Sequence, residues 1–222
     1  MKIEEPTWQF LQALDQNNNK EWFHAHKKDY QKAKGNFEVF VDALISGISA
    51  FDDLGTVEAK QCTFRINRDM RFVKDGRPYN THFSAIISPN GKNFDGAYYY
   101  LRIQPGNSEL TGGTACQLGK AALSGLRNHI DQQGEDLDHI VQSASFSNQF
   151  GGVTGLQYKR MPSGFDDDHQ HAEWLKMRQF LARTSLADDL VTSEGLYERV
   201  MDGFRSAFPL IRFINEGIQS QL

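Results

Sequence analysis

Residues Phe64–Tyr79 read FRINRDMRFVKDGRPY, and this stretch combines an alternating pattern with a high density of charge. If it forms a β-strand, one face carries Phe64, Ile66, Arg68, Met70 and Phe72. Arg68 is then the one charged residue in an otherwise apolar row. An unpaired guanidinium in an apolar environment costs several kcal/mol of folding free energy. We therefore expect Arg68 to contact a carboxylate, a carbonyl group or a bound anion.

The residues that follow predict a partner strand, so that the two segments form a β-hairpin. Asp75-Gly76 is a turn signal, and Pro78 is unsuited to a central strand because it lacks a backbone N–H. A second alternating run then consists of Thr81, Phe83, Ala85 and Ile87. The expected hairpin is half-buried, with a polar outer row and an inner row that contains Arg68.

Two further segments extend the predicted sheet. Ala97–Ile103, AYYYLRI, has strong β propensity and ends before Pro105-Gly106, and Glu109–Thr114 is a candidate fourth strand. Four adjacent segments of this kind predict an antiparallel meander and not an alternation of strands and helices. We therefore predict an α+β fold, in which an antiparallel β-meander in the middle of the chain packs against N-terminal and C-terminal helices.

Helices are predicted before this sheet. Pro6 suits the first position of a short helix. Asn18, followed three residues later by Glu21, fits a capping box for a second helix. Gly35-Asn36 predicts a break or kink, and beyond it the apolar residues of Phe37–Ile48 recur with the strongest helical period in the chain.

Helical periodicity returns after the predicted sheet. The pattern turns helical at Gly119, and Phe146–Tyr158 predicts a loop that ends in a short strand. Lys159–Phe165 is a turn-rich basic segment. Leu190–Leu222 predicts a long helix that is broken near Pro209, because proline removes a helical hydrogen bond.

Length and composition are those of a globular protein. The 222 residues are 39% hydrophobic, which is enough to bury a core without disulfides or metals. No repeat, linker or low-complexity segment interrupts the sequence, so residues 1–222 are predicted to form a single α+β domain. The formal net charge of -4 disfavours nucleic acid as a partner, because non-specific binding depends on many contacts between cations and phosphates.

The sequence also bears on the compartment and on membranes. The N-terminus, MKIEEPTWQF, has no apolar run of signal-peptide length, and no stretch approaches the ~20 apolar residues of a membrane span. Cys62 and Cys116 match no metal-ligand spacing. Two thiols in a chain of this size suit a reducing compartment better than a disulfide framework. We therefore predict a cytoplasmic protein without a membrane partner.

Three motifs give the chain a family resemblance. They are Asn17–Tyr30, which begins NNNKEWF, Phe64–His82, which begins FRINRD, and Lys159–His169, which begins KRMPSGFD. The chain resembles the conserved hypothetical proteins grouped as domain-of-unknown-function family 2461. The departures from the family pattern are Lys20, Gly76, Arg77, Asn80 and Gln170. The resemblance implies a similar α+β fold and no particular reaction, since the family has no established activity.

The arginine-rich stretch is the first candidate for a ligand site, because guanidinium groups match the geometry of phosphate and carboxylate. We expect a phosphorylated or carboxylated small molecule to bind there. The residues expected to form the site are Arg65, Asn67, Arg68, Asp69, Arg71, Lys74, Asp75, Arg77, Tyr79 and His82. In this hypothesis the arginines clamp the anion, an aspartate orients them or acts as a base, and Tyr79 and His82 line the pocket.

Two alternatives remain for the same residues. In the first, aromatic side chains between the cations stack on bases, as in a nucleic-acid-binding or nucleic-acid-processing module. In the second, Asp69 and Asp75 pair with the arginines in a purely structural network. The sequence contains no known catalytic motif, so neither a catalytic residue nor a cofactor is assigned, and whether the protein is an enzyme is left open.

Two histidine-containing segments are weaker candidates. His26 lies on an aromatic helical face, where it is either an acid–base or ligand-orienting group, or a partly buried histidine with one ring nitrogen satisfied. Asp166–His171, DDDHQH, resembles a metal cluster, but a helix start capped by Asp168 within a solvated acidic run is favoured. We predict no metal site. If a metal were bound, we would expect Asp166 and His169 to be its ligands.

Overall fold

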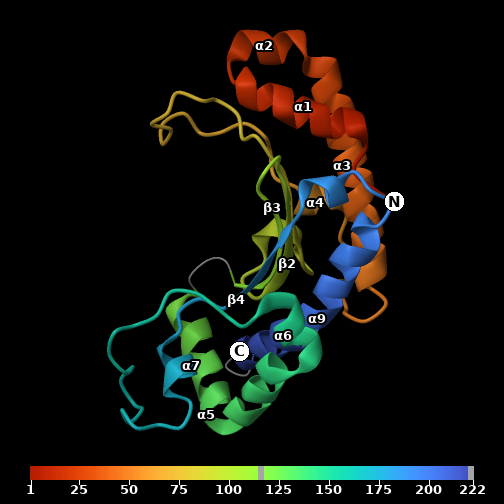
Figure 1. Ribbon diagram of the computed structural model, residues 1–222. Helices are drawn as coiled ribbons and strands as arrows, with labels where there is room; N and C mark the ends of the chain where they lie inside the picture. Colours follow the sequence, from red (N-terminus) through yellow and green to blue (C-terminus); the bar gives the residue numbers. More distant parts are fainter. Residues whose placement is uncertain (115–117, 220–222) are drawn as a thin grey trace. The chain divides into compact units, whose positions relative to one another are not determined.

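A computed structural model describes residues 1–114 and 118–219 of the chain (Figure 1). In this part of the chain, four strands form an antiparallel sheet in the order β1-β2-β3-β4. The strands are β1 (Phe83–Ile87), β2 (Tyr98–Ile103), β3 (Ser108–Gly113) and β4 (Leu181–Leu186). Helices precede and follow the sheet in the sequence, which confirms the predicted α+β fold.

The first three strands confirm the meander, and the fourth strand comes from a different part of the chain than expected. β1 lies within the second arm of the predicted hairpin, and β2 and β3 match the two predicted segments that follow it to within one residue at each end. β4 follows the helices α5 (Lys120–Gln142), α6 (Ala144–Phe150) and α7 (Ala172–Lys176) in the sequence. The sheet is therefore completed by a non-local strand.

The prediction of a strand over Phe64–Phe72 is wrong. The segment is joined to the chain that returns beside it by isolated bridges and single backbone hydrogen bonds. Ile66 is buried, but Phe64, Met70 and Phe72 are 40%, 43% and 80% exposed, so most of the expected apolar face is not packed. Strand pairing is only weakly stabilised when neither face of the strands is packed. The segment therefore extends beyond the sheet as an irregular ribbon.

Contacts between Cα atoms divide the chain into two compact units, and each unit is built from several separate segments. Unit 1 consists of Met1–Asn93, Tyr100–Leu110 and Ser185–Asp202. Unit 2 consists of Phe94–Tyr99, Thr111–Thr184 and Gly203–Leu222. The single domain expected from the sequence stays a prediction.

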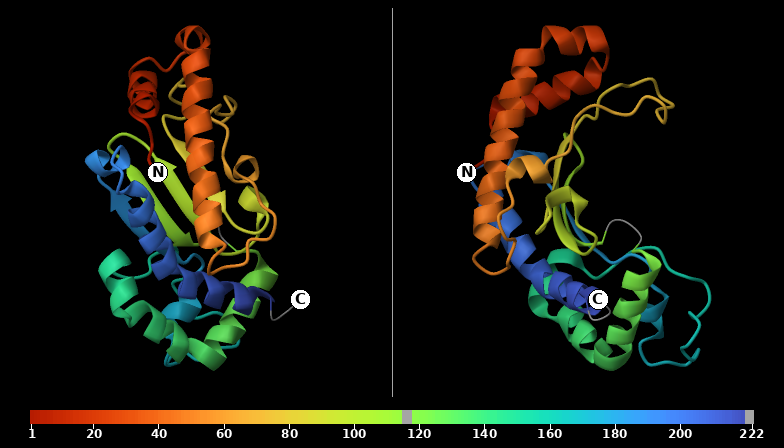
Figure 2. Two further views of the ribbon diagram at one scale, coloured as in Figure 1. Left: turned by 90° about the vertical axis from the view of Figure 1, so that its right-hand side faces the viewer. Right: turned by 180° about the vertical axis from the view of Figure 1, so that it is seen from behind.

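Unit 1 contains the N-terminal helices. They are α1 (Glu5–Gln16), α2 (Lys20–Ala25), α3 (Lys27–Ile48) and α4 (Ala59–Cys62), and the short helices η1 (Gly91–Asn93) and α8 (Asp188–Val191) come later in the chain. α1 packs along α3 (Figure 2). The Asn36 side chain on α3 joins the two helices, because its Oδ1 accepts hydrogen bonds from the Glu4 N–H and the Thr7 hydroxyl. The core residues of this pair include Leu11, Leu14, Phe37, Phe40 and Leu44.

Two details of these helices differ from the sequence predictions. The N-cap of α2 is Asn19, whose side chain accepts from the Trp22 N–H at 2.9 Å, and not Asn18. α3 continues through Gly35 without the predicted break. A glycine costs about 1 kcal/mol in a helix, and the buried face of α3 outweighs this cost.

Unit 2 contains α5, α6, α7 and most of α9 (Leu196–Gln219). α9 runs through Pro209, so the predicted break near this proline is wrong. The buried side chains of Phe204, Ile211 and Ile214 on the same helix offset the lost hydrogen bond. α6 also replaces the first part of the loop predicted over Phe146–Tyr158.

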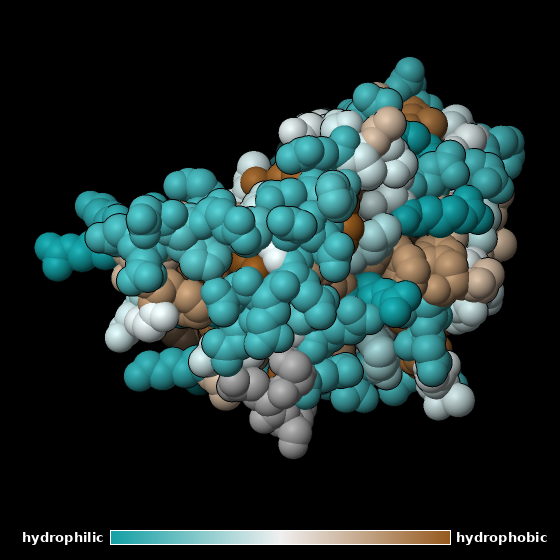
Figure 3. Space-filling view, turned by 90° about the horizontal axis from the view of Figure 1, so that it is seen from below, coloured by the Kyte–Doolittle hydropathy of each residue, from teal (hydrophilic) through white to brown (hydrophobic). Residues whose placement is uncertain are grey.

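The surface agrees with the polar composition of the chain. The face seen in Figure 3 is covered mainly by hydrophilic side chains, with hydrophobic ones in small separate patches. Among the residues that the structure describes, no helix is both long enough and apolar enough to cross a lipid bilayer.

Candidate functional site

Residues 64–82, which we call the arginine ribbon, form two segments that run side by side to a tip (Figure 1, Figure 2). Asn18 holds this ribbon by its base. Its side-chain amide donates to the Tyr79 carbonyl at 2.8 Å and accepts from the Tyr79 N–H at 3.1 Å. The Tyr79 ring is buried and stacks on Phe23, with 3.9 Å between ring centroids. The first two family motifs therefore contact each other, since Asn18 belongs to one and Tyr79 to the other.

Three of the four arginines predicted to clamp a ligand are paired with carboxylates. The pairs are Arg68 with Asp75 (2.9 Å), Arg71 with Asp69 (2.6 Å) and Arg77 with Asp15 (2.6 Å). Arg68 also donates to the carbonyl group of Arg77 at 3.1 Å. The expectation that Arg68 contacts a carboxylate or a carbonyl group is confirmed, and both partners are internal.

The same pairs alter the two aspartates of the ribbon. Hydrogen bonds from Arg71 lower the pKa of Asp69, and the hydrogen bond from Arg68 lowers the pKa of Asp75. A carboxylate with a lowered pKa is a weaker base, which counts against the predicted role of either aspartate in abstracting a proton. Both pairs lie at the surface, where water and salt screen them.

The remaining residues of the predicted site have different surroundings. Arg65 and Lys74 are exposed and have no ion pair or hydrogen bond with another residue in the described parts of the chain, and Asn67 is also exposed. His82 is half-buried, and burial together with the charge of Arg102 lowers its pKa to about 4. Its imidazole is therefore neutral at pH 7 and carries no charge for an anion.

A second group of cations surrounds a pocket of about 490 Å³ in unit 2, which we call the cationic pocket. Its lining residues are Arg127, Tyr158, Lys159, Arg160, Met161, Pro162 and Ser163. Arg127 projects from α5, and the other six are consecutive residues between α6 and α7. Of the lining residues that the structure describes, three are cationic and none is acidic.

A hydrogen bond and an aromatic ring position the Arg127 side chain. Its Nε donates to the Leu175 carbonyl at 3.0 Å, and its guanidinium carbon lies 5.2 Å from the centre of the Tyr158 ring. The guanidinium carbon of Arg178 lies 4.7 Å from the same ring centre. Cation–π contacts contribute roughly 0.5–2 kcal/mol each, so Tyr158 orients two guanidinium groups.

The guanidinium of Arg127 is incompletely satisfied. Its Nη2 is buried and has no hydrogen-bond partner among the described residues. Burial lowers the pKa of Arg127, although the group stays protonated because its ordinary pKa is so high. A buried donor without an acceptor costs roughly 1–3 kcal/mol, and more when it is charged. An anion oxygen in this pocket would supply the acceptor.

Sequence reasoning recognised Lys159–Phe165 as basic but missed its connection with Arg127. The spacing of residues along the sequence does not show that a side chain on α5 contacts this loop, because α6 and the residues after it separate α5 from the loop. The available signal was the third family motif, which begins at Lys159. This motif contains fewer cations than the arginine ribbon.

The histidines after the cationic pocket are used internally. His169 Nε2 lies 2.9 Å from Asp131 Oδ1, and His169 Nδ1 accepts the backbone N–H of His171 at 3.0 Å. Since Nδ1 is the acceptor, Nε2 carries the hydrogen and donates to Asp131. The His171 ring is buried against Gly134, where a Cβ would clash with it, and its Nδ1 lies 3.1 Å from Asp138. These contacts attach the segment to α5.

The structure bears on the two interpretations of Asp166–His171, a metal cluster and a capped helix start. Within residues 1–114 and 118–219, no group of three or more histidine, cysteine, aspartate or glutamate side chains is arranged to hold a metal ion. The predicted helix start is present but without the expected cap, since α7 begins after His171 and no side chain caps it. Cys62 is buried, and burial raises the pKa of its thiol to about 11. Cys116 lies outside the described residues.

His26 has the local contacts that its second interpretation describes, and these contacts involve only one of its ring nitrogens. It is partly buried and stacks on Trp22, with 4.1 Å between ring centroids. Its Nδ1 lies 2.8 Å from the Trp22 carbonyl, so one ring nitrogen is satisfied within the helix. The neighbouring asparagines cap and connect segments of backbone, as Asn18 and Asn19 show.

Comparison with known proteins adds one finding to this geometry. The sequence model of the conserved hypothetical proteins called DUF2461 matches residues 6–213. The matched range includes the arginine ribbon, every lining residue of the cationic pocket and the N-terminal asparagines. No curated protein matches the chain, and no solved structure matches it.

Proposed function

We propose that this chain, which belongs to the DUF2461 family of conserved hypothetical proteins, binds a phosphorylated or carboxylated small molecule in the cationic pocket. The proposal rests on Arg127, whose Nη2 is buried and has no acceptor among the described residues. The pocket around it is lined by three cations and no acid. A phosphate or carboxylate oxygen supplies both the acceptor and the negative charge that this pocket lacks.

The pocket suits an anion of metabolite size. Its volume of about 490 Å³ falls within the range of small-molecule sites, roughly 300–1,000 Å³. Lys159 and Arg160 are exposed and attract the ligand at longer range, whereas half-buried Arg127 fixes its orientation. Ser163 adds a hydroxyl group that donates to a further oxygen.

The arginine ribbon is the weaker site for the same class of ligand. Its Arg68, Arg71 and Arg77 already contact carboxylates, so an incoming anion has to displace an aspartate from each. Binding then replaces one anion by another at each arginine, so little binding free energy is gained. In the cationic pocket no such exchange is needed, because the lining contains no acid.

The proposal includes a cytoplasmic location. Cys62 is a free thiol in the core, and its pKa of about 11 keeps it protonated at neutral pH. Free thiols persist in reducing compartments. Phosphorylated and carboxylated metabolites are present in the same compartment.

Isothermal titration calorimetry with inorganic phosphate, pyrophosphate and citrate tests the proposed binding. We expect at least one of these anions to bind, and the double variant Lys159→Ala/Arg160→Ala to weaken its affinity about tenfold or more, since charge-assisted hydrogen bonds are worth roughly 1.5–3 kcal/mol. Arg127→Lys keeps the charge but removes the planar fork, and we expect a loss of similar size.

The matched control is Arg65→Ala/Lys74→Ala, which removes two exposed cations from the arginine ribbon and changes the net charge equally. We expect this variant to bind like the wild-type protein. Equal weakening in both double variants would show that the anions respond only to overall charge. That result, or the absence of binding by all three anions, would contradict the proposal.

A second candidate function belongs to the arginine ribbon. Phe72 is 80% exposed, and Arg65 and Lys74 are exposed without an ion pair among the described residues, so an aromatic ring and cations are both available to a single-stranded nucleic acid. Stacking of a base on an aromatic ring contributes roughly 1–3 kcal/mol. Fluorescence anisotropy with labelled single strands at low salt tests this candidate. Binding should fall steeply with salt and weaken in Phe72→Ala; no binding at low salt would exclude it.

A further inference from the structure

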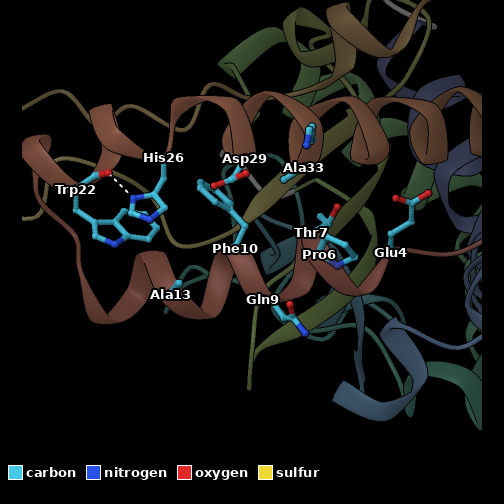
Figure 4. A pocket seen from close by; sticks show the side chains of 11 residues that line it. Glu4, Pro6, Thr7, Gln9, Phe10, Ala13, Trp22, His26, Asp29 and Ala33 are labelled. Atoms are coloured by element: carbon cyan, nitrogen blue, oxygen red, sulfur yellow. Dashed lines mark hydrogen bonds between the residues drawn. The ribbon is translucent and has the colours of Figure 1, made fainter.

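A second pocket, of about 520 Å³, lies between the N-terminal helices, and we call it the aromatic pocket (Figure 4). All of its lining residues belong to unit 1. They come from α1 and the residues just before it, from α2, and from α3 and its N-cap. This pocket therefore shares no residue with the cationic pocket, and it calls for a separate explanation.

Aromatic rings form one end of the aromatic pocket. Phe10 and Trp22 are 6.0 Å apart between ring centroids, and the His26 ring stacks on Trp22 at 4.1 Å with an interplanar angle of 17°. Figure 4 shows these three side chains together at one end, with Glu4 at the other. Trp22 and His26 are only half-buried, so this end is accessible to a planar ligand.

The tautomer of His26 follows from its hydrogen bond. A carbonyl oxygen only accepts, so the His26 Nδ1 that faces the Trp22 carbonyl at 2.8 Å carries the hydrogen. In the neutral ring, Nε2 then has a free lone pair, and it has no partner among the described residues. The pocket therefore offers an unoccupied acceptor beside its aromatic end.

Carboxylates add further acceptors. Asp29 lies on α3 three residues after His26, and Glu4 lies at the opposite end of the pocket. Neither carboxylate forms an ion pair or a side-chain hydrogen bond within the described residues, and Glu4 has an electrostatic interaction with Lys2, which lies outside the lining. Lys32 is the one cation among the described lining residues, so the two carboxylates give this lining an excess of negative charge.

We propose that the aromatic pocket binds an organic cation with a planar aromatic body, such as an aromatic amidine, guanidine or ammonium compound. The rings of Phe10 and Trp22 pack against the planar body, and cations are attracted to such rings. The cationic group donates to Asp29, and a second donor reaches His26 Nε2. The charge preference is opposite to that of the cationic pocket.

Titration with benzamidine tests this proposal, with benzoate and benzamide as probes of the same shape but different charge. The readout is the indole N–H resonance of Trp22 in ¹H–¹⁵N spectra, assigned by its loss in Trp22→Phe. We expect benzamidine to shift this resonance in a saturable way. Benzamide should bind more weakly, and benzoate should not bind.

Asp29→Asn keeps the size of the side chain and removes its charge. We expect it to weaken benzamidine binding about three- to tenfold, which corresponds to ~0.7–1.4 kcal/mol, and to leave benzamide binding unchanged. The control is Asp95→Asn, because Asp95 is an exposed carboxylate outside the pocket. This variant should bind benzamidine as the wild-type protein does.

Three outcomes would overturn the proposal. They are the absence of any shift of the Trp22 resonance by benzamidine, equal shifts by benzamidine and benzoate, and equal weakening by Asp29→Asn and Asp95→Asn. The experiments behind these outcomes measure binding at the aromatic pocket alone. The proposal for the cationic pocket is tested with anions and with variants of unit 2, so either proposal can fail without the other.

Discussion

The arginine ribbon and the cationic pocket are both rich in arginine and lysine, and they differ in what balances the charge. In the ribbon, Arg68 and Arg71 contact Asp75 and Asp69, which lie in the same short segment. In the cationic pocket, the lining contains three cations and no acid, and one guanidinium nitrogen is buried without an acceptor among the described residues. A high density of charge in the sequence therefore does not by itself indicate an anion site; unbalanced charge does.

This difference arises from how each region is assembled. The ribbon carries its own counter-ions, because Asp69 and Asp75 alternate with the arginines in the sequence. The pocket takes Arg127 from α5 and the rest of its lining from a loop after α6, and two acids on α5, Asp131 and Asp138, contact histidines instead. Cations that are brought together from separate segments thus lack internal carboxylate partners among the described residues, and we expect a bound anion to balance their charge.

The largest expected effect concerns the base of the ribbon. Asn18→Ala removes both hydrogen bonds to the Tyr79 backbone and leaves a partly buried N–H and C=O without partners. We expect the free energy of unfolding to fall by about 2–3 kcal/mol, measured by urea denaturation. Asn67→Ala is the matched control, since Asn67 is exposed and its side chain has no hydrogen bond within the described residues. A similar loss in both variants would contradict the role of Asn18.

A second prediction uses the pH dependence of His82. The folded pKa is about 4 and the ordinary value is 6.5, so between these pH values the unfolded chain binds a proton that the folded chain does not. Stability therefore falls as the pH falls through this window, by about 2 kcal/mol between pH 7 and pH 5. Urea denaturation of the wild-type protein and of His82→Gln at both pH values measures the effect.

The His82→Gln variant should lose less stability than the wild-type protein over the same pH interval, by roughly this amount. An equal loss in both proteins would show that His82 titrates normally. A charged imidazole at this end of the ribbon would then be available to an anion, and the contrast with the cationic pocket would weaken.

Sequence patterns predicted much of the fold and only the outline of the sites. β propensity located β2 and β3, because Ala97–Ile103 and Glu109–Thr114 have packed surroundings that match their local preference. Gly35 and Pro209 misled the helix predictions, since burial along α3 and α9 outweighs their intrinsic cost. Apolar and polar residues do alternate over Phe64–Phe72. Such alternation shows which residues share a face of a strand, and not whether another part of the protein covers that face.

Among the sites, the partners of Arg68 were anticipated as classes, and their identity required three-dimensional contacts. Asp75 was within reach of sequence reasoning because it lies in the same motif. Asp15, the partner of Arg77, lies near the end of α1, far from the motif in the sequence, and could not be predicted in this way. The same limit applies to the cationic pocket, where Arg127 and Tyr158 meet only after α5 and the later loop are both in place.

A smaller effect is expected where the pocket cations contact an aromatic ring. Tyr158→Ala removes the ring that both Arg127 and Arg178 contact, and we expect phosphate affinity to fall about fivefold, or ~1 kcal/mol. Tyr158→Phe keeps the ring and removes the hydroxyl, so it should retain most of the affinity. Calorimetric titration of both variants measures the difference. Equal losses would assign the effect to the hydroxyl and not to the ring.

The smallest expected effect is the coupling between Arg68 and Asp75 at the surface. Because Arg68 lowers the pKa of Asp75, the pair stabilises the fold above the ordinary carboxyl value of 3.8 and loses this contribution as the pH falls below it. A double-mutant cycle with Arg68→Met and Asp75→Asn should give a coupling that is weaker than the loss in Asn18→Ala and that shrinks as salt is added. Arg65→Met is the control, because Arg65 forms no ion pair among the described residues and its charge acts on Asp69 and not on Asp75. If Arg68→Met instead abolished anion binding, Arg68 would be a ligand-binding residue, and the ribbon and the cationic pocket would not differ as we propose.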